Sequence, residues 1–504
     1  MSRNFTSLVQ LSLCSELDLN AYLILNKKPT RQEQKYKSLN KYINQHSSGW
    51  KKRLELANLL YETGKWSEAV LEFERVTVAQ PRLIEPRLQL GKILQLINRK
   101  TEAIAVYQEA LILSENLATQ QHLVGLIESC KGNNNTQKAI AAFQSVSSLE
   151  TRNLAHWLAL GQLYIEAEHP TDALATFETI LSLDPNNLMG LVYSHDLFLA
   201  LGNFPEAEKL LSKALAVAPE DVQTLKRVIT NRCRKRLVFG VEGKQTKKLI
   251  QTLIKQASSS AEAYNLLAHY YIFRGDRQKG IEISKQFAKE HDRNPHAWYY
   301  YSQSLLDISE NEAAAEAILK AHQLFSGGVG DWRSYALDHR QVYRSLCEIL
   351  PAAGRLDKTH AIIAEMLQYF PQSWSVWAIA GRVCVKYLQQ SDIGCSYSLR
   401  GTTLQPQLAD AWLCHGRVLS LADQHQQAIS ALTQGWQLIS PKVENFKSVS
   451  AAVWLGESYQ KLGNDLASQT WLTTAVQKAE KLIEFDPIKA NYWQDRALAG
   501  SRRL

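Results

Sequence analysis

Small residues recur along the first half of this chain at a nearly constant spacing. Five alanines are separated by 34, 36, 34 and 34 residues: Ala69, Ala103, Ala139, Ala173 and Ala207. A large apolar residue follows each alanine after four positions: Phe73, Tyr107, Phe143, Phe177 and Leu211. Because residues four apart lie on the same face of an α-helix, each alanine and its large neighbour predict one helix with an apolar stripe. A fixed period of this length predicts an array of similar helical units.

The other half of the repeat precedes each alanine, and its clearest copy begins at Trp157. The segment reads Trp157-Leu158-Ala159-Leu160-Gly161, followed by Tyr164, Ala173, Phe177 and Pro185. This order of Trp, Leu-Gly, Tyr, Ala, Phe and Pro resembles the signature of the tetratricopeptide repeat. The resemblance covers about residues 47 to 485, on the order of twelve units by the family period. It implies two antiparallel helices per unit, with Gly161 and Ala173 small where the two helices cross.

The fold class that follows is all-α, an α-solenoid of antiparallel helix pairs forming a right-handed superhelix. One helix pair cannot bury its apolar face alone, so stacking of neighbouring pairs into an open curved array supplies the core. The scarcity of chain breakers, with 24 glycines and 13 prolines in 504 residues, agrees with long helices. Four tryptophans fall at the core position of the repeat, which favours packing over a sugar-binding or base-binding platform: Trp157, Trp298, Trp377 and Trp412.

Two irregularities of the period divide the chain. One degenerate unit fits between residues 221 and 258, and the excess length after Ala314 includes Ser326-Gly327-Gly328-Val329-Gly330, a candidate boundary between two sub-arrays. The predicted organisation is an N-terminal helical cap at 1–46, repeats at 47–220, the degenerate basic unit at 221–258, repeats at 259–325, a loop or extra-helix insertion at 326–340, repeats at 341–485 and a C-terminal capping helix at 486–504.

Signatures of catalysis are absent, so the sequence predicts no enzyme, no cofactor and no metal site. The segment FGVEGKQT at 239–246 fails as a phosphate-binding loop because Val238 stands where its first glycine belongs and Gln245 follows the lysine in place of Ser or Thr. Seven widely spaced cysteines without a CxxC pair argue against zinc and disulfide frameworks and suit a reducing cytoplasm. No apolar run is long enough to span a membrane.

Basic residues concentrate in one window of the chain. Ten of them lie between positions 226 and 255: Lys226, Arg227, Arg232, Arg234, Lys235, Arg236, Lys244, Lys247, Lys248 and Lys255. Glu242 is the only acid there, so the window carries +9 while the whole chain carries +8. The residues lie off the apolar stripes of two predicted helices, and such a patch would attract phosphate or an acidic polypeptide. The alternative is a solvated face of a degenerate repeat.

In the tetratricopeptide-repeat family the first helix of each unit lines the concave surface that binds a ligand. Carrying those positions across predicts seven groove residues: Asn265, His269, Tyr299, Gln303, Arg344, Arg382 and Arg417. The resemblance implies a scaffold or adaptor that binds a peptide or protein partner in this groove. Two alternatives stay open: binding of nucleic acid or another anionic partner through the basic window, and service as the regulatory subunit of a separately encoded enzyme.

Overall fold

The computed structural model describes residues 31–46, 49–62, 65–97, 99–131, 135–257, 260–326, 339–440 and 444–502. Within these ranges the regular structure consists of 26 helices, and no strand occurs. The chain divides into two compact units, Met1–Ser114 and Glu115–Leu504, which are described separately below. The all-α fold class predicted from the sequence is confirmed.

Unit 1 holds five of the helices. They are α2 (Arg31–Gln45), α3 (Trp50–Glu62), α4 (Trp66–Ala79), α5 (Ile84–Leu96) and α6 (Lys100–Leu113). Helices α3 and α4 form one pair and α5 and α6 form the next, while α4 packs against α5 and α2 packs against α3. Each pair therefore covers the apolar face of its neighbour, as a repeat architecture requires.

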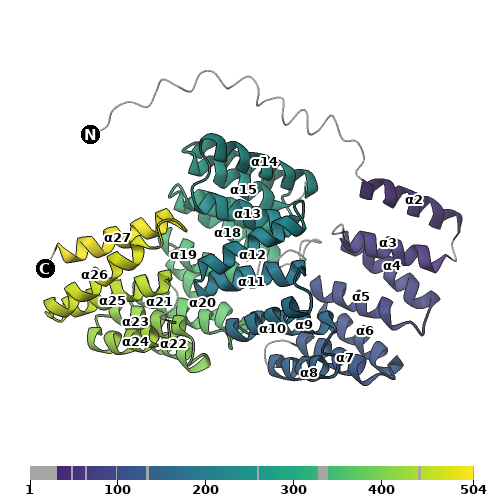
Figure 1. Ribbon diagram of the computed structural model, residues 1–504, viewed down its shortest axis with the longest axis horizontal. Coiled ribbons are helices and arrows are strands. Elements are labelled where there is room, and N and C mark those ends of the chain that lie inside the picture. The colour runs from purple at the N-terminus through teal and green to yellow at the C-terminus, as the bar shows by residue number, and fades with distance from the viewer. Residues whose placement is uncertain are drawn as a thin grey trace, which may run out of the picture. The chain divides into compact units, whose positions relative to one another are not determined.

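Unit 2 contains ten further helix pairs and a final helix (Figure 1). The helices are α7 (Leu117–Cys130), α8 (Thr136–Leu149), α9 (Leu154–Glu166), α10 (Pro170–Leu183), α11 (Leu188–Leu201), α12 (Phe204–Val217), α13 (Val222–Arg234), α14 (Gly240–Gln256), α15 (Ala261–Phe273), α16 (Arg277–Glu290), α17 (Pro295–Leu306), α18 (Asn311–Ser326), α19 (His339–Ala352), α20 (Leu356–Tyr369), α21 (Trp374–Lys386), α22 (Ser391–Leu404), α23 (Ala409–Leu421), α24 (His425–Gln437), α25 (Phe446–Lys461), α26 (Asp465–Glu480) and α27 (Pro487–Ser501). Counted over the described residues of both units, α3 to α26 form twelve pairs, the number that the repeat period predicts.

The period irregularities have different outcomes. The degenerate segment 221–258 folds as a regular pair, α13 and α14. Most of the predicted insertion at 326–340 lies outside the described residues, which omit 327–338. The boundary between the two compact units lies at Ser114 and Glu115, inside the interval of 36 residues between Ala103 and Ala139.

Small residues stand where two helices of a pair approach each other. All five period-marking alanines lie on second helices and are completely buried. On the first helices, glycines face the large apolar residues of the second: a Cβ at Gly161 would lie 2.7 Å from the ring of Phe177, and one at Gly416 would lie 2.6 Å from Leu432. No side chain fits in that gap, so the small residues are required by close packing.

Polar residues begin most first helices of unit 2. Side-chain oxygens of Asn, Asp or Ser accept a hydrogen bond from a backbone N–H of the first turn in α7, α9, α11, α13, α15, α17, α21 and α25. Such a cap satisfies one of the N–H groups that a helix start leaves without a partner. The recurring cap marks the start of these eight first helices.

Four tryptophans make the same contact in four different units. The indole Nε1 of Trp157, Trp298, Trp377 and Trp412 donates to the backbone carbonyl six residues earlier, at distances between 2.8 and 2.9 Å. Each tryptophan thus ties the start of its helix to the turn before it. This structural role agrees with the prediction that these residues belong to the repeat itself.

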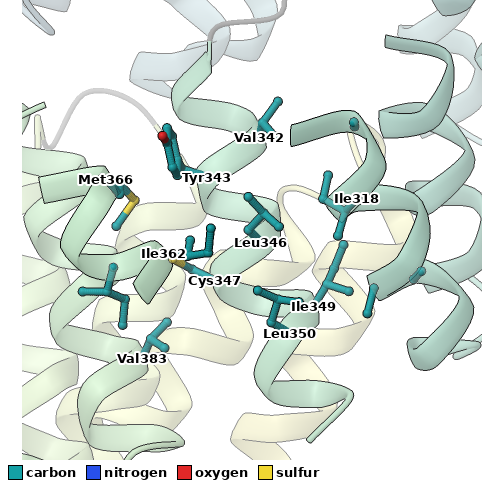
Figure 2. Packing of buried hydrophobic residues seen from close by; sticks show 14 of the residues in the cluster. Ile318, Val342, Tyr343, Leu346, Cys347, Ile349, Leu350, Ile362, Met366 and Val383 are labelled. Atoms are coloured by element: carbon teal, nitrogen blue, oxygen red, sulfur yellow. The ribbon is translucent and has the colours of Figure 1, made fainter. Parts of the chain in front are cut away.

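A large cluster of buried side chains runs from α17 to α21 (Figure 2). Leu346 and Leu350 of α19 lie between Ile318 of α18 and Val383 of α21, and none of these four is more than 4% exposed. The cluster includes residues that precede positions 327–338 and residues that follow them. Helices α18 and α19 therefore share one core although the repeat period is broken between them.

Within unit 2, segments that are distant in sequence also touch. Phe204 at the start of α12 contacts the rings of Phe446 and Phe485, with centroids 5.7 and 5.4 Å away. Gly202 just before it has φ +86°, and a Cβ there would come within 2.2 Å of Asn445. In a repeat array each pair touches mainly its neighbours, so these contacts between distant pairs add to the stacking of the array in this unit.

Candidate partner-binding surface

The first helices of successive pairs form a continuous layer over much of unit 2. Helix α15 contacts α13 and α17, α21 contacts α19 and α23, and α25 contacts α23 and α27. All seven predicted groove residues lie on this layer: Asn265 and His269 on α15, Tyr299 and Gln303 on α17, Arg344 on α19, Arg382 on α21 and Arg417 on α23. We call the layer from α13 to α27 the first-helix surface.

Polar side chains of this surface bond to each other from one first helix to the next. Arg382 pairs with Glu348 of α19. Arg417 Nη1 lies 3.2 Å from Glu457 Oε2 of α25, and Gln303 Nε2 donates to Ser345 Oγ of α19 at 3.2 Å. The cause is the repeat period, because equivalent positions 34 to 42 residues apart come to lie side by side. Three of the seven predicted groove residues, Gln303, Arg382 and Arg417, therefore form rungs of a polar ladder across the units.

The ladder is buried to different depths along its length. His269 Nε2 lies 3.5 Å from Asp307 Oδ2, and burial lowers the pKa of His269 while it raises the pKa of Asp307. Burial also lowers the pKa of Arg417. By contrast, the side chain of Arg382 is 40% exposed and that of its partner Glu348 is 55% exposed. The rung formed by Arg382 and Glu348 is thus the one most accessible to a partner.

Arg344 makes a different contact, with a turn almost two hundred residues away. Glu168, in the turn between α9 and α10, places its carboxylate against the N-terminus of α21. It accepts from Ser373 Oγ at 2.9 Å and from the backbone N–H of Ser375 at 3.4 Å, and it lies 3.4 Å from Arg340 and 3.5 Å from Arg344. A helix N-terminus and two guanidinium groups are the environment that a carboxylate prefers. Sequence reasoning missed Glu168, since nothing in its own repeat marks it.

The basic window is partly neutralised inside the fold. Four of its cations form ion pairs of 2.5 Å: Lys226 with Glu262, Arg227 with Asp196, Arg232 with Glu242 and Lys235 with Glu208. Three of these acids lie outside the window and reach it from neighbouring helices. Arg236 donates to the carbonyl of Phe273 at 3.1 Å. The exposed cations of the window are Lys244, Lys248 and Lys255, all on α14, so the charged face is smaller than the sequence count of +9 suggests.

Buried thiols account for most of the cysteines that the structure describes. Burial raises the pKa of Cys233, Cys347 and Cys414 to about 12 and that of Cys384 to about 11. Such thiols stay protonated at neutral pH and are poor nucleophiles and metal ligands. In the described ranges, no group of three or more His, Cys, Asp or Glu side chains is arranged to hold a metal ion.

A buried histidine on α23 predicts sensitivity of the fold to acid. His415 is 7% exposed and its Nδ1 lies 2.8 Å from Ser398 Oγ. Burial lowers the pKa of His415 to about 4, whereas in the unfolded chain this pKa returns to about 6.5. The unfolded state therefore takes up the proton first, and stability that is complete above about pH 6.5 is lost as the pH falls toward 4.

We expect His415 to remove about 2 kcal/mol from the free energy of unfolding between pH 7 and pH 5. Urea unfolding at both pH values measures this loss of free energy of unfolding in the wild-type chain and in His415→Asn. The variant should lose about 2 kcal/mol less than the wild type. His360→Asn, at an exposed position on α20, is the control and should lose as much as the wild type. If both variants lost the same free energy of unfolding between pH 7 and pH 5, His415 would not be the group responsible for the sensitivity to acid.

None of the helices that the structure describes has both the length and the apolar character needed to cross a bilayer. This finding agrees with the absence of a long apolar run in the sequence.

Comparison with known proteins supports the repeat. Models of the family described as "Tetratricopeptide repeat" match residues 54–118, 132–191 and 265–328. Among curated proteins, the anaphase-promoting complex subunit cut9 of Schizosaccharomyces pombe is 25% identical over 159 residues, which are 31% of this chain. The matched region is 21% of that relative, so the chain spans about a fifth of its length.

Solved structures of low sequence identity also align over most of the chain. The crystal structure of yeast Tom70 matches with 13% identity and a TM-score of 0.42, covering 90% of this chain and 97% of the other. The crystal structure of the APC/C hetero-tetramer Cut9-Hcn1 matches with 14% identity and a TM-score of 0.36, covering 96% and 99%. Family models thus match three regions of the chain as tetratricopeptide repeats, and the twelve helix pairs of the described residues extend the same architecture beyond them.

Proposed function

We propose that this protein is a non-catalytic scaffold that binds a peptide or protein partner along its first-helix surface. The observation that carries the proposal is the polar ladder, whose most exposed rung is Arg382 with Glu348. Ion pairs exposed to this degree are worth about 0–1 kcal/mol, so a partner can exchange them for contacts of its own at little cost. An extended peptide offers backbone groups and side chains at regular spacing, which suits donors and acceptors repeated along the layer.

The family supports the same reading. Tetratricopeptide-repeat arrays are interaction modules, and the curated relative is by its name a subunit of a larger complex. We infer that this chain likewise serves in an assembly. Identification of the partner will show whether it is an enzyme that this chain regulates.

The test reverses the charges of the exposed rung. The double variant Arg382→Glu with Glu348→Arg keeps an internal ion pair and should leave the free energy of unfolding within about 0.5 kcal/mol of the wild type. A partner is first captured by the wild-type chain and shown to bind at fixed stoichiometry after purification. Its dissociation constant for the double variant should then rise about tenfold or more, because both charges that it meets are exchanged.

The control is Arg400→Glu, which reverses an exposed charge on the second helix α22. It should bind the partner as the wild type does. A partner that binds all three chains with one dissociation constant would contradict the proposed surface.

Binding of an anionic partner is the second candidate, and the three exposed lysines of α14 favour it. Arg232 and Lys235 are engaged in ion pairs, so the test uses Lys244→Ser, Lys248→Ser and Lys255→Ser together. A gel shift with single-stranded nucleic acid at low salt should be lost in the triple variant. For three phosphate contacts the logarithm of affinity should fall with that of salt concentration with a slope of about −2. No shift of the wild-type chain at low salt would remove this candidate.

A further inference from the structure

A cavity of about 480 Å³ lies between the middle of unit 2 and its last helix. Helices α13 and α15 form one side of it, and the start of α27 forms the other. Residues that line it are thus more than two hundred positions apart in the sequence. The volume is within the range of about 300–1,000 Å³ that small-molecule and side-chain pockets occupy.

The floor and walls of this cavity are largely apolar. Leu266 is 6% exposed and Cys233 is 3% exposed, and Phe273 stands beside them. At the mouth, Ile488 and Tyr492 of α27 leave 44% and 55% of their surfaces exposed. Exposed apolar side chains around a concave site gain free energy when a ligand covers them.

The polar groups of the cavity carry an excess of positive charge. Arg234 and Lys489 are the two cations, and Asp486 is the one acid in its lining. Asp486 already serves as the N-cap of α27, where its side chain accepts from the backbone N–H of Lys489 at 3.1 Å. Over the part of the chain that the structure describes, neither Arg234 nor Lys489 has a carboxylate within 4.0 Å.

One buried donor in this lining also lacks an acceptor. The Nε of Arg234 is inaccessible and forms no hydrogen bond among the described residues. Arg234 does bond to Asn231 through its Nη2 at 2.5 Å, and its guanidinium lies 5.5 Å from the ring centre of Phe204. A buried donor without an acceptor is destabilising. An oxyanion bound in the cavity would supply an acceptor that the fold itself does not provide.

We propose that this cavity is a binding site for a carboxylate that is attached to an apolar group. The carboxylate lies between Arg234 and Lys489, and the apolar group lies on Leu266, Phe273 and Tyr492. One extra positive charge matches a singly charged carboxylate, whereas a doubly charged phosphate would leave negative charge unbalanced. The cavity lies on the first-helix surface but does not include the rung formed by Arg382 and Glu348. Its test is therefore distinct from that of the proposed function, because the probes can bind whether or not a partner binds at that rung.

The chemistry admits two sources, a free small acid or the end of a peptide chain, and the experiment separates them. The first pair of probes is 3-phenylpropionate and the uncharged 3-phenylpropanol. The second is the peptide Gly-Gly-Leu-Phe with a free carboxylate and the same peptide with a C-terminal amide. Binding to the full chain is measured by ligand-observed NMR, and stability by thermal unfolding.

We expect the carboxylates to bind with a dissociation constant on the order of 1 mM or below, and their uncharged counterparts about tenfold more weakly. Binding of the peptide acid alone would assign the site to chain ends, and binding of 3-phenylpropionate alone would assign it to small acids. Equal binding of each acid and its uncharged counterpart would overturn the proposal.

Arg234→Met separates a binding role from a structural one. Burial lowers the pKa of Arg234, so its charge is unfavourable in the empty site. The variant should lose carboxylate binding about tenfold or more while the melting temperature without ligand stays the same or rises. Arg502→Gln, at an exposed position after α27, is the control and should bind as the wild type does. Unchanged binding in Arg234→Met would overturn the proposal, as would a lowered melting temperature with unchanged affinity per folded molecule.

Discussion

Replacement of Phe177 by alanine is expected to lower the free energy of unfolding of unit 2 by about 3–5 kcal/mol. Phe177 is completely buried on α10, where it faces Gly161 of α9 and stacks on Tyr193 with ring centroids 4.9 Å apart. Since glycine has no side chain that can move into the space, the neighbouring helix cannot fill the void. Urea unfolding followed by circular dichroism measures the loss, and hydrogen exchange should place it in α9 to α11, because repeats interact mainly with their neighbours.

Two further variants test the mechanism of that loss. Leu183→Ala, on the same helix at a 41% exposed position, should change stability by no more than about 0.5 kcal/mol. Gly161→Ala alone should destabilise because its methyl group would meet the Phe177 ring at 2.7 Å. Combined with Phe177→Ala, the same methyl group enters the void and alanine favours the helix by about 1 kcal/mol, so the double variant should be more stable than Phe177→Ala. Additive losses would contradict the packing argument.

Replacement of Glu168 by alanine is expected to cost about 3 kcal/mol. The Glu168 side chain is 13% exposed and that of Arg340 is 14% exposed, so removal of the carboxylate takes away a partly buried negative charge that lies against two guanidinium groups. It also removes the acceptor for Ser373 Oγ and for the backbone N–H of Ser375 at the N-terminus of α21. The free energy of unfolding should fall, and the first-turn amides of α21 should exchange hydrogen faster.

The controls distinguish the charge from the contact. Glu168→Gln keeps one carbonyl oxygen for the serines but no charge for the arginines, so its loss should be smaller than that of Glu168→Ala. Glu178→Ala removes an exposed carboxylate from α10 and should change stability by no more than about 0.5 kcal/mol. If Glu168→Ala lost no more than Glu178→Ala, the contact between the α9–α10 turn and α21 would not contribute to stability.

The fold of this protein follows from local patterns that recur in every repeat. Ala173 and Phe177 lie four residues apart on one face of a helix, and Gly161 stands on the preceding helix where Phe177 needs room. These relations span fewer than 20 residues, so the period, the helix pairs and their number were predictable. The position of Trp157 in the repeat was visible in the pattern, but the hydrogen bond from its indole N–H to the carbonyl of Thr151 was not.

The candidate site was only partly predictable. The helix that carries Arg382 followed from the repeat, but its pairing with Glu348 did not, because the two meet only when neighbouring first helices lie side by side. The same reason accounts for the basic window: a count of charges along the sequence includes Lys226 and Arg227 but omits Glu262 and Asp196, which neutralise them from other helices. A local surplus of charge in a repeat protein is therefore a poor measure of its surface charge.

The sequence alone predicts that this chain is an array of helix pairs, how many pairs the period allows and which small and large residues meet inside each pair, because these contacts are local and repeat with the period. Only the tertiary structure decided that Glu168 meets Arg344, that Phe204 meets Phe446 and that Arg234 faces the start of α27. Those contacts join segments that belong to different repeats. Their positions depend on the rotations between successive pairs, which accumulate along the array, so no single stretch of the sequence specifies them.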